Sequence, residues 1–423
     1  MNQQPRGRHL VAADRGFATG GDMLARLFGG GFNRILDRLD AGIVQGGIDA
    51  TLPHGSRRIL GGRNPGPMPV VHLHSWRALV RLITSGSVGW YKAWEGGEWS
   101  SPDPVPLFDL FMRNGESLGN VGRAKGFWRM MNRALHRLRR NSRSRARANI
   151  AFHYDLGNDF YASWLDRSMT YSSALFAEPY SDAEPLEAAQ ERKIRALLDR
   201  LELKPGQRLL EIGCGWGSLA EIAARDYGVD VVGLTLSSEQ KAWTDARMHK
   251  AGLFGRVSIE LTDYRDVQGT FDAVASVEMV EAVGQDYWPS YLGAISRALK
   301  PGGGAAIQLI SIREPLFEAY AENTDFIQTY IFPGGMLVSE DRFRRIAEES
   351  GLNWRDRKGF GLHYAETLKR WRGSYDEAVE EGRLPPGFDA RFHNLWRYYL
   401  MYCEGGFRGG GIDVAQVTLV KRD

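Results

Sequence analysis

Three glycines spaced two residues apart, at positions 213, 215 and 217, limit the folds open to this chain. They lie in Leu209–Ser218, which reads Leu-Leu-Glu-Ile-Gly-Cys-Gly-Trp-Gly-Ser. The apolar residues before them predict a buried parallel strand, and the periodicity of Leu219–Arg225 predicts a helix after them. Glycine permits positive φ and removes every Cβ from the floor of a turn. A flat cofactor can therefore lie against the main chain beside the helix N-terminus.

The spacing of these glycines narrows the choice of cofactor. Dinucleotide sites use G-x-G-x-x-G and an acid near the end of the next strand. Here the turn is G-x-G-x-G, and the next strand, Val229–Ser237, ends in hydroxyl residues. No P-loop Lys-Ser/Thr pair for a triphosphate follows. Glu211 with the three glycines resembles the S-adenosylmethionine (SAM) turn of Rossmann-like methyltransferases.

Strand and helix patterns alternate along the second part of the chain. Further strands are predicted at Val229–Leu234, Phe271–Val277, Gly304–Ile310 and Val414–Val420. This alternation predicts an α/β fold with a doubly wound sheet, whose ligands bind at the carboxyl ends of the strands. The predicted domains are a smaller N-terminal α+β domain (1–120) with lipid binding as one expected role, a basic linker helix (121–150) and a catalytic domain (151–423).

Basic residues are concentrated in one segment. Ten Lys and Arg residues and no acid lie between Arg123 and Arg147, so the 54 basic residues of the chain leave 44 elsewhere against 51 acidic ones. This segment predicts a basic amphipathic helix. Three roles are open to it: contact with an anionic membrane, a solvated linker, or nucleic-acid binding. Membrane contact is favoured, because no nucleic-acid recognition motif lies beside it.

Composition indicates a cytoplasmic protein that is soluble or peripheral to a membrane, and the expected location is the inner face of that membrane. The two cysteines, Cys214 and Cys403, give neither a disulfide framework nor a zinc pattern. The N-terminal residues lack the apolar core of a signal peptide. No run approaches the roughly 18 apolar residues of a membrane-spanning helix. The sequence leaves the oligomeric state open, a homodimer included.

Several separate motifs, in order, resemble the cyclopropane-fatty-acyl-phospholipid synthases. The ordered match runs from about residue 150 to the C-terminus, and Ser85–Trp99 resembles the N-terminal domain of that family more weakly. The motifs are His153–Tyr161, Met169–Ser172, Glu211–Gly217, Gly233–Ser237 with Gln240, Tyr330–Gly334, Tyr364–Leu368 and Tyr398–Arg408.

This resemblance implies SAM-dependent methyl transfer to the cis double bond of an acyl chain in a membrane phospholipid. Methyl addition leaves a carbocation, and loss of a proton from the new methyl group closes a cyclopropane ring. A base must therefore lie beside the cation, and aromatic faces can stabilise it. Members of the family hold a bicarbonate ion as that base.

The resemblance also implies roles for individual residues. Glu281 and Tyr364 match the carboxylate and the tyrosine of the bicarbonate site, and Ser173 and Gln308 take two further positions there. The cofactor residues it implies are Tyr171, Ser172, Gly213, Gly215, Gly217, Thr235, Leu236, Gln240, Asp263 and Tyr264.

Two of these positions depart from the family pattern. Ser173 stands where the family commonly has Cys, and Gln308 stands where it commonly has His. Both can donate hydrogen bonds to an anion, but a glutamine cannot accept a proton. A different base geometry predicts loss of a proton elsewhere, which yields a branched alkene. Two readings stay open beside these: a small-molecule N- or O-methyltransferase, and a SAM- or lipid-binding protein that has lost its base.

Overall fold

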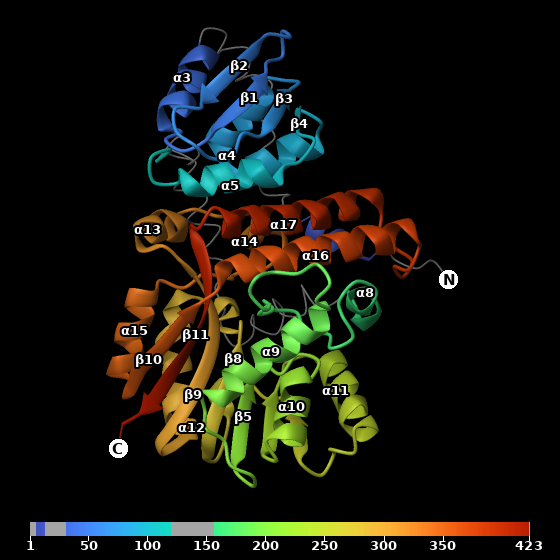
Figure 1. Ribbon diagram of the computed structural model, residues 1–423, viewed down its shortest axis with the longest axis vertical. Helices are drawn as coiled ribbons and strands as arrows, with labels where there is room; N and C mark the ends of the chain where they lie inside the picture. The colour runs from blue at the N-terminus through green and yellow to red at the C-terminus, as the bar shows by residue number, and fades with distance from the viewer. Residues whose placement is uncertain (1–5, 13–30, 120–155, 423) are drawn as a thin grey trace. The chain divides into compact units, whose positions relative to one another are not determined.

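The computed structural model describes residues 6–12, 31–119 and 156–422 (Figure 1). The predicted linker helix at 121–150 lies outside these residues, as do the first three residues of the predicted His153–Tyr161 motif. The described chain forms two compact units. One combines the N-terminal part with 313–333 and 386–412, and the other contains 141–312, 334–385 and 413–423. No helix in the described ranges has the length and apolar character needed to cross a bilayer.

The second unit is built on a seven-stranded, mostly parallel sheet. Its strand order is β10-β11-β9-β8-β5-β6-β7. The parallel pairs are β5–β6, β5–β8, β6–β7 and β8–β9, whereas β10 and β11 are antiparallel. The strands are β5 (Arg208–Ile212), β6 (Asp230–Leu234), β7 (Val257–Glu260), β8 (Phe271–Val277), β9 (Leu299–Ile312), β10 (Leu352–Gly359) and β11 (Ile412–Lys421). Strand order reverses beside β5, where doubly wound sheets form their ligand crevice.

Helices pack on this sheet through apolar faces. On α9, Ile194, Leu197 and Leu198 are buried in one cluster with Leu219 and Ile222 of α10 and with residues of β5 and β6. Figure 1 shows α9 and α10 in front of the strands. The helices of this unit are α8 (Asn158–Ala162), α9 (Leu186–Asp199), α10 (Ser218–Asp226), α11 (Ser238–Lys250), α12 (Trp288–Ala298), α15 (Glu340–Glu349) and α16 (Gly361–Glu380), with short turns η1 (Tyr264–Asp266), η2 (Val280–Ala282) and η3 (Gln285–Tyr287).

The first unit contains a four-stranded mixed sheet of order β2-β1-β3-β4. Strand β1 pairs antiparallel with β2 and parallel with β3, and β3 pairs antiparallel with β4. The strands are β1 (Gly47–Thr51), β2 (Arg57–Gly61), β3 (Val70–Leu73) and β4 (Trp99–Ser100); the helices are α1 (Arg8–Val11), α3 (Phe32–Gly42), α4 (Arg77–Glu95), α5 (Val105–Arg113), α13 (Glu314–Glu322), α14 (Phe326–Tyr330) and α17 (Ala390–Arg408).

Aromatic side chains from distant parts of the sequence form the core of the first unit. The ring of Tyr91 in α4 lies 4.9 Å from that of Tyr398 in α17 and 5.0 Å from that of Phe326 in α14. Asp325 accepts hydrogen bonds from Ser87 and from Tyr402, each at 2.7 Å. Residues 313–333 and 386–412, which fall inside the predicted 151–423 domain, therefore pack with the N-terminal part.

The predicted α/β class with a doubly wound sheet is confirmed. The strand predicted at Phe271–Val277 matches β8, and the strand predicted at Val229–Leu234 matches β6 to within one residue. The sequence also predicts a capped helix over Ser75–Ser85. In the structure α4 instead continues to Glu95, because the chain bends at Gly86 (φ 56°) and resumes helical geometry. A glycine tolerates that φ at little cost.

Candidate active site

The glycine turn between β5 and α10 has the backbone that its sequence predicts. Gly213, Gly215 and Gly217 have φ values of 84°, 51° and 83°. A Cβ on Gly215 would meet nothing within 4 Å, whereas a Cβ on Gly217 would lie 2.4 Å from Cγ2 of Thr244. The first glycine of that pair leaves space open in the turn, and the second allows α10 to approach α11.

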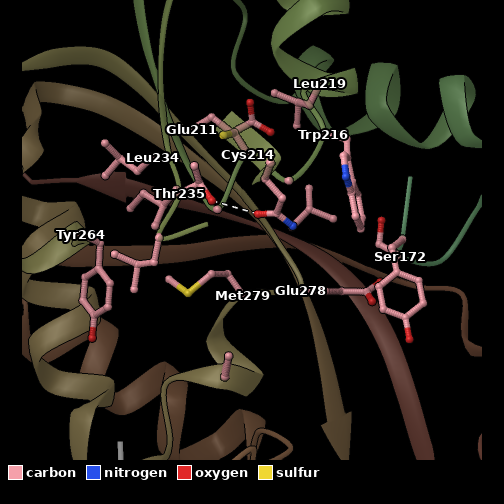
Figure 2. A pocket seen from close by; sticks show the side chains of 18 of the residues that line it. Ser172, Glu211, Cys214, Trp216, Leu219, Leu234, Thr235, Tyr264, Glu278 and Met279 are labelled. Carbon is pink, nitrogen blue, oxygen red and sulfur yellow. Dashed lines mark hydrogen bonds between the residues drawn. The ribbon is translucent and has the colours of Figure 1, made fainter. Parts of the chain in front are cut away.

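A pocket opens at the carboxyl ends of β5, β6 and β8 (Figure 2). Most of the predicted cofactor residues line it. They are Tyr171, Ser172, Gly213, Gly215, Thr235, Leu236, Gln240, Asp263 and Tyr264. Gly217 is not among the lining residues and instead forms the N-cap of α10.

Two hydrogen-bonded pairs fix the polar part of this lining. The Thr235 hydroxyl donates to Oε1 of Gln240 at 2.9 Å, and both side chains are buried. Arg265 donates to both carboxylate oxygens of Asp263, at 2.8 and 2.6 Å. The fork of the guanidinium holds that carboxylate in one orientation.

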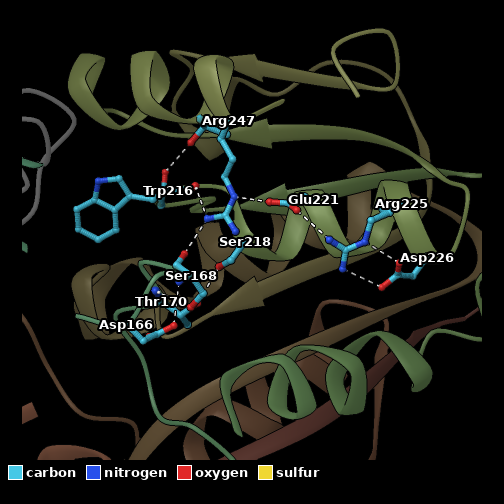
Figure 3. A network of polar contacts seen from close by, with 11 residues as sticks. Asp166, Ser168, Thr170, Trp216, Ser218, Glu221, Arg225, Asp226 and Arg247 are labelled. Atoms are coloured by element: carbon cyan, nitrogen blue, oxygen red, sulfur yellow. Dashed lines mark hydrogen bonds and ion pairs between the residues drawn. The ribbon is translucent and has the colours of Figure 1, made fainter. Parts of the chain in front are cut away.

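An arginine of α11 ties the loop before the pocket to the glycine turn (Figure 3). Arg247 donates from Nη1 to the carbonyl of Ser168 at 2.7 Å and pairs through Nε with Glu221 at 2.5 Å. Thr170 and Ser218 share a hydroxyl–hydroxyl hydrogen bond of 2.8 Å. The loop that carries Tyr171 and Ser172 is therefore fastened to the start of α10.

A buried lysine and two acids lie on another wall of the pocket. Nζ of Lys193 donates to Oγ of Ser172 at 2.6 Å, and burial lowers the pKa of this lysine to about 8. Burial raises the pKa of Glu211 to about 8. Oε2 of Glu211 is buried and has no hydrogen-bond partner within the described residues. The sequence analysis did not assign a role to Lys193, since a lysine in an amphipathic helix is usually solvated.

Glu278 brings three of the predicted catalytic residues together. Its carboxylate accepts hydrogen bonds from the Ser173 backbone N–H at 2.9 Å, from Nε2 of Gln308 at 2.8 Å and from the Tyr364 hydroxyl at 2.7 Å. Glu278 follows β8, lines the pocket and points toward the Ser172 side of it (Figure 2). Burial raises the pKa of Glu278. The sequence analysis did not assign a role to Glu278. Its position directly after a parallel strand is the signal that points to a ligand site there.

Glu281, the fourth predicted catalytic residue, has a different environment. Its Oε1 accepts a hydrogen bond from the Ile310 N–H, and its Oε2 is buried without a partner in the described part of the chain. It is not among the residues that line the pocket. Burial, with repulsion from Glu278, raises the pKa of Glu281 to about 8. Its catalytic role stays a prediction.

Comparison with known proteins identifies the family. A family model described as "Mycolic acid cyclopropane synthetase" matches residues 141–417, which is more than half of the chain. The chain belongs to this family. It is a SAM-dependent methyltransferase, and the names of the relatives in the next paragraph agree with this activity.

Three relatives cover most of the chain or of their own length. Tuberculostearic acid methyltransferase UfaA1 of Mycobacterium tuberculosis is 39% identical over 370 residues, covering 84% of this chain and 83% of its own. Cyclopropane-fatty-acyl-phospholipid synthase of Escherichia coli K12 is 36% identical over 341 residues, covering 80% and 84%. The crystal structure of mycolic acid cyclopropane synthase CmaA1 with SAH and CTAB is 30% identical, with a TM-score of 0.60, and covers 65% of this chain and 98% of that one.

The pocket of this family member fits SAM. The buried Oε2 of Glu211, which has no hydrogen-bond partner within the described residues, would accept a hydrogen bond from a donor group of SAM. The open space over Gly215 admits a ligand against the main chain. When bound, SAM supplies an electrophilic methyl group. Glu211, Thr235 with Gln240, and Asp263 are the polar residues of this chain that would hold it.

Replacing Glu281 by glutamine is expected to flatten the pH dependence of stability. Since the folded state raises the pKa of Glu281 from 4.5 to about 8, the folded protein keeps a proton that the unfolded chain loses in this window. The wild-type free energy of unfolding therefore falls as pH rises from about 4.5 to 8. We expect Glu281→Gln to be more stable than wild type at pH 8.5, on the order of 2–4 kcal/mol, and to differ less at pH 5.

Urea unfolding at these two pH values checks this result. Glu349→Gln, at an exposed position of α15, is the matched control and should change stability by less than about 0.5 kcal/mol at either pH. Parallel pH profiles for wild type and Glu281→Gln would show that Glu281 is ionised in the folded protein.

Proposed function

We propose that this protein transfers a methyl group from SAM to the cis double bond of an unsaturated acyl chain in a membrane phospholipid. The relatives support a lipid substrate, since the Escherichia coli relative is named a cyclopropane-fatty-acyl-phospholipid synthase. The observation that carries the proposal is the carboxylate of Glu278 on the pocket wall, bound by Tyr364 and Gln308. Alkene methylation needs such an acceptor, because the resulting carbocation must lose a proton.

Aromatic residues beside the pocket suit a cationic intermediate. The ring of Tyr171, which lines the pocket, lies 5.2 Å from that of Trp371 and 5.4 Å from that of Tyr161. Trp216 also lines the pocket, and its ring lies 5.0 Å from that of Tyr161. Aromatic faces attract cations through their quadrupoles. A small-molecule N- or O-methyltransferase forms no such carbocation.

Cyclopropane fatty acid is the leading product, formed when the new methyl group loses the proton. A methyl- or methylene-branched chain is the second candidate. The hydrogen-bond donors of the predicted bicarbonate site bind the Glu278 carboxylate, so the base has a different position from that of a bicarbonate ion. We also propose peripheral contact with the inner face of the membrane, where this substrate lies. The basic segment between Arg123 and Arg147 supports that contact.

Proton NMR of lipids after incubation of the protein with SAM and monounsaturated, anionic phospholipid vesicles tests this proposal. High-field cyclopropyl protons are expected. Vinyl protons together with an added carbon would show that the product is the branched chain and not the cyclopropane. No added carbon would overturn the lipid substrate. Neutral vesicles are the control for membrane contact, and equal rates on both vesicles would contradict the role of the basic segment.

A further inference from the structure

The hydrogen-bond donors of the predicted bicarbonate site already bind a side chain of the protein. The Ser173 N–H, Nε2 of Gln308 and the Tyr364 hydroxyl all point to the Glu278 carboxylate, at 2.7 to 2.9 Å. Ser173 and Gln308 are fully buried, which leaves them little freedom to serve another anion. The residues present therefore do not fit a bicarbonate ion.

The amide of Gln308 is held in its orientation from the opposite side. Its Oε1 accepts a hydrogen bond of 3.1 Å from Nε2 of Gln416 in β11. The same Nε2 donates to the carbonyl of Lys193 at 3.0 Å. Gln308 consequently presents its NH₂ group to Glu278, and a carboxylate satisfies that donor.

The backbone at Glu278 adds a second observation. Its φ is 49°, in the left-handed region that non-glycine residues rarely adopt. Its own N–H donates to the carbonyl of Gln308 at 2.8 Å, which fixes this geometry. Strained conformations of this kind cluster at functional sites, although an exposed residue such as Glu202 can also adopt one.

We propose that Glu278 is the proton acceptor of the reaction and takes the place of bicarbonate. This inference rests on the proposed function. Once the double bond has gained the methyl group, one C–H bond breaks. If it belongs to the new methyl group, its electron pair forms the second C–C bond of the ring; if it belongs to a carbon next to the cationic carbon, its electron pair forms the C=C bond of a branched product. The proton passes to a carboxylate oxygen of Glu278, which releases it to water before the next turnover. Tyr364 and Gln308 orient the carboxylate.

Charge and burial agree with this role. Burial raises the pKa of Glu278, and the hydrogen bonds and Lys193 oppose that rise. Such a carboxylate is a stronger base than one in water, and its three donors hold its oxygens in a fixed orientation. Glu281 is less suited, because it does not line the pocket and its Oε1 is occupied by the Ile310 N–H.

The test compares turnover with and without bicarbonate in CO₂-free buffer. Wild-type turnover should change less than about twofold. Glu278→Gln should lower kcat by at least about 100-fold, while calorimetry gives a SAM Kd within about threefold of wild type, which also shows that the variant is folded. Glu278→Gly removes the carboxylate and relieves the backbone strain at this position. Added bicarbonate should raise the turnover of this variant at least about tenfold.

A readout independent of activity uses thermal unfolding. Millimolar bicarbonate should raise the Tm of Glu278→Gly and leave that of wild type unchanged. Glu202 offers matched controls, since it is an exposed glutamate with a φ of 48°. Glu202→Gln and Glu202→Gly should behave as wild type in every assay.

The failures are distinguishable. No lipid product from the wild-type protein overturns the proposed function and, with it, the base role of Glu278. If wild type forms product but needs bicarbonate, or if Glu278→Gln keeps wild-type turnover while Glu281→Gln loses it, the proposed function stands and the inference is overturned.

Discussion

Replacing Gly217 by alanine is expected to lower the free energy of unfolding by about 2–5 kcal/mol. About 1–2 kcal/mol comes from placing an L-residue at a φ of 83°. A further ~1–3 kcal/mol comes from overpacking, because the new Cβ would lie 2.4 Å from Cγ2 of Thr244. Since Gly217 is the N-cap of α10, the shift needed to relieve this contact should also weaken SAM binding by at least tenfold.

Thr244→Ser separates these two costs. This change removes Cγ2 but keeps the hydroxyl that donates to the Gly215 carbonyl at 3.2 Å. In a double-mutant cycle measured by urea unfolding, Gly217→Ala should therefore cost roughly 1–2 kcal/mol less in the Thr244→Ser background than in the wild-type protein. Gly206→Ala is the matched control, because Gly206 has a φ of 82° with open space around its Cβ position. An equal loss at both glycines would show that α10 and α11 adjust freely.

Replacing Lys193 by methionine is expected to destabilise the protein by about 1–3 kcal/mol at pH 7, because buried polar groups lose a hydrogen-bond donor. The lysine is 1% exposed, and its charge interacts favourably with Glu278, Asp166 and Glu211. Methionine keeps most of the chain length but leaves these buried acids without a cation and the Ser172 hydroxyl without its donor. Removal of this donor is costly because the polar groups that it leaves behind stay desolvated.

Urea unfolding measures this loss. Lys204→Met is the control, at an exposed turn position where the same change should alter stability by less than about 0.5 kcal/mol. A loss below about 1 kcal/mol at Lys193 would mean that the three acids are neutral in the folded protein and need no cation.

The sequence predicted the cofactor side of the site better than the catalytic side. Local backbone rules determine the glycine turn, so the spacing of Gly213 and Gly215 predicted the positive φ values of 84° and 51° that the structure shows. The family resemblance implied Thr235 and Gln240, and both line the pocket. The surroundings of Glu278 depend instead on residues at least 30 positions distant, such as Gln308 and Tyr364, and no local pattern contains those pairings.

Short strands and the grouping of segments also escaped the sequence analysis. β7 spans only Val257–Glu260, too few residues for its alternation to be distinguished from a loop. The sequence also predicts a helix over Phe388–Tyr402, close to the observed α17, but the packing of α17 with Tyr91 and Phe326 is a long-range aromatic contact. The order of residues along the chain does not reveal such partners.

The position of β11 between β9 and β10 has a consequence during protein synthesis. β10 pairs only with β11 in the described sheet, and one edge of β9 has no other neighbour. Lys421, at the end of β11, lies 109 positions after Ile312, at the end of β9. At ~5–20 residues per second, a ribosome needs roughly 5–20 s to make this interval. For that time the nascent chain exposes an unpaired strand edge, which is the period in which chaperone binding would best protect it from aggregation.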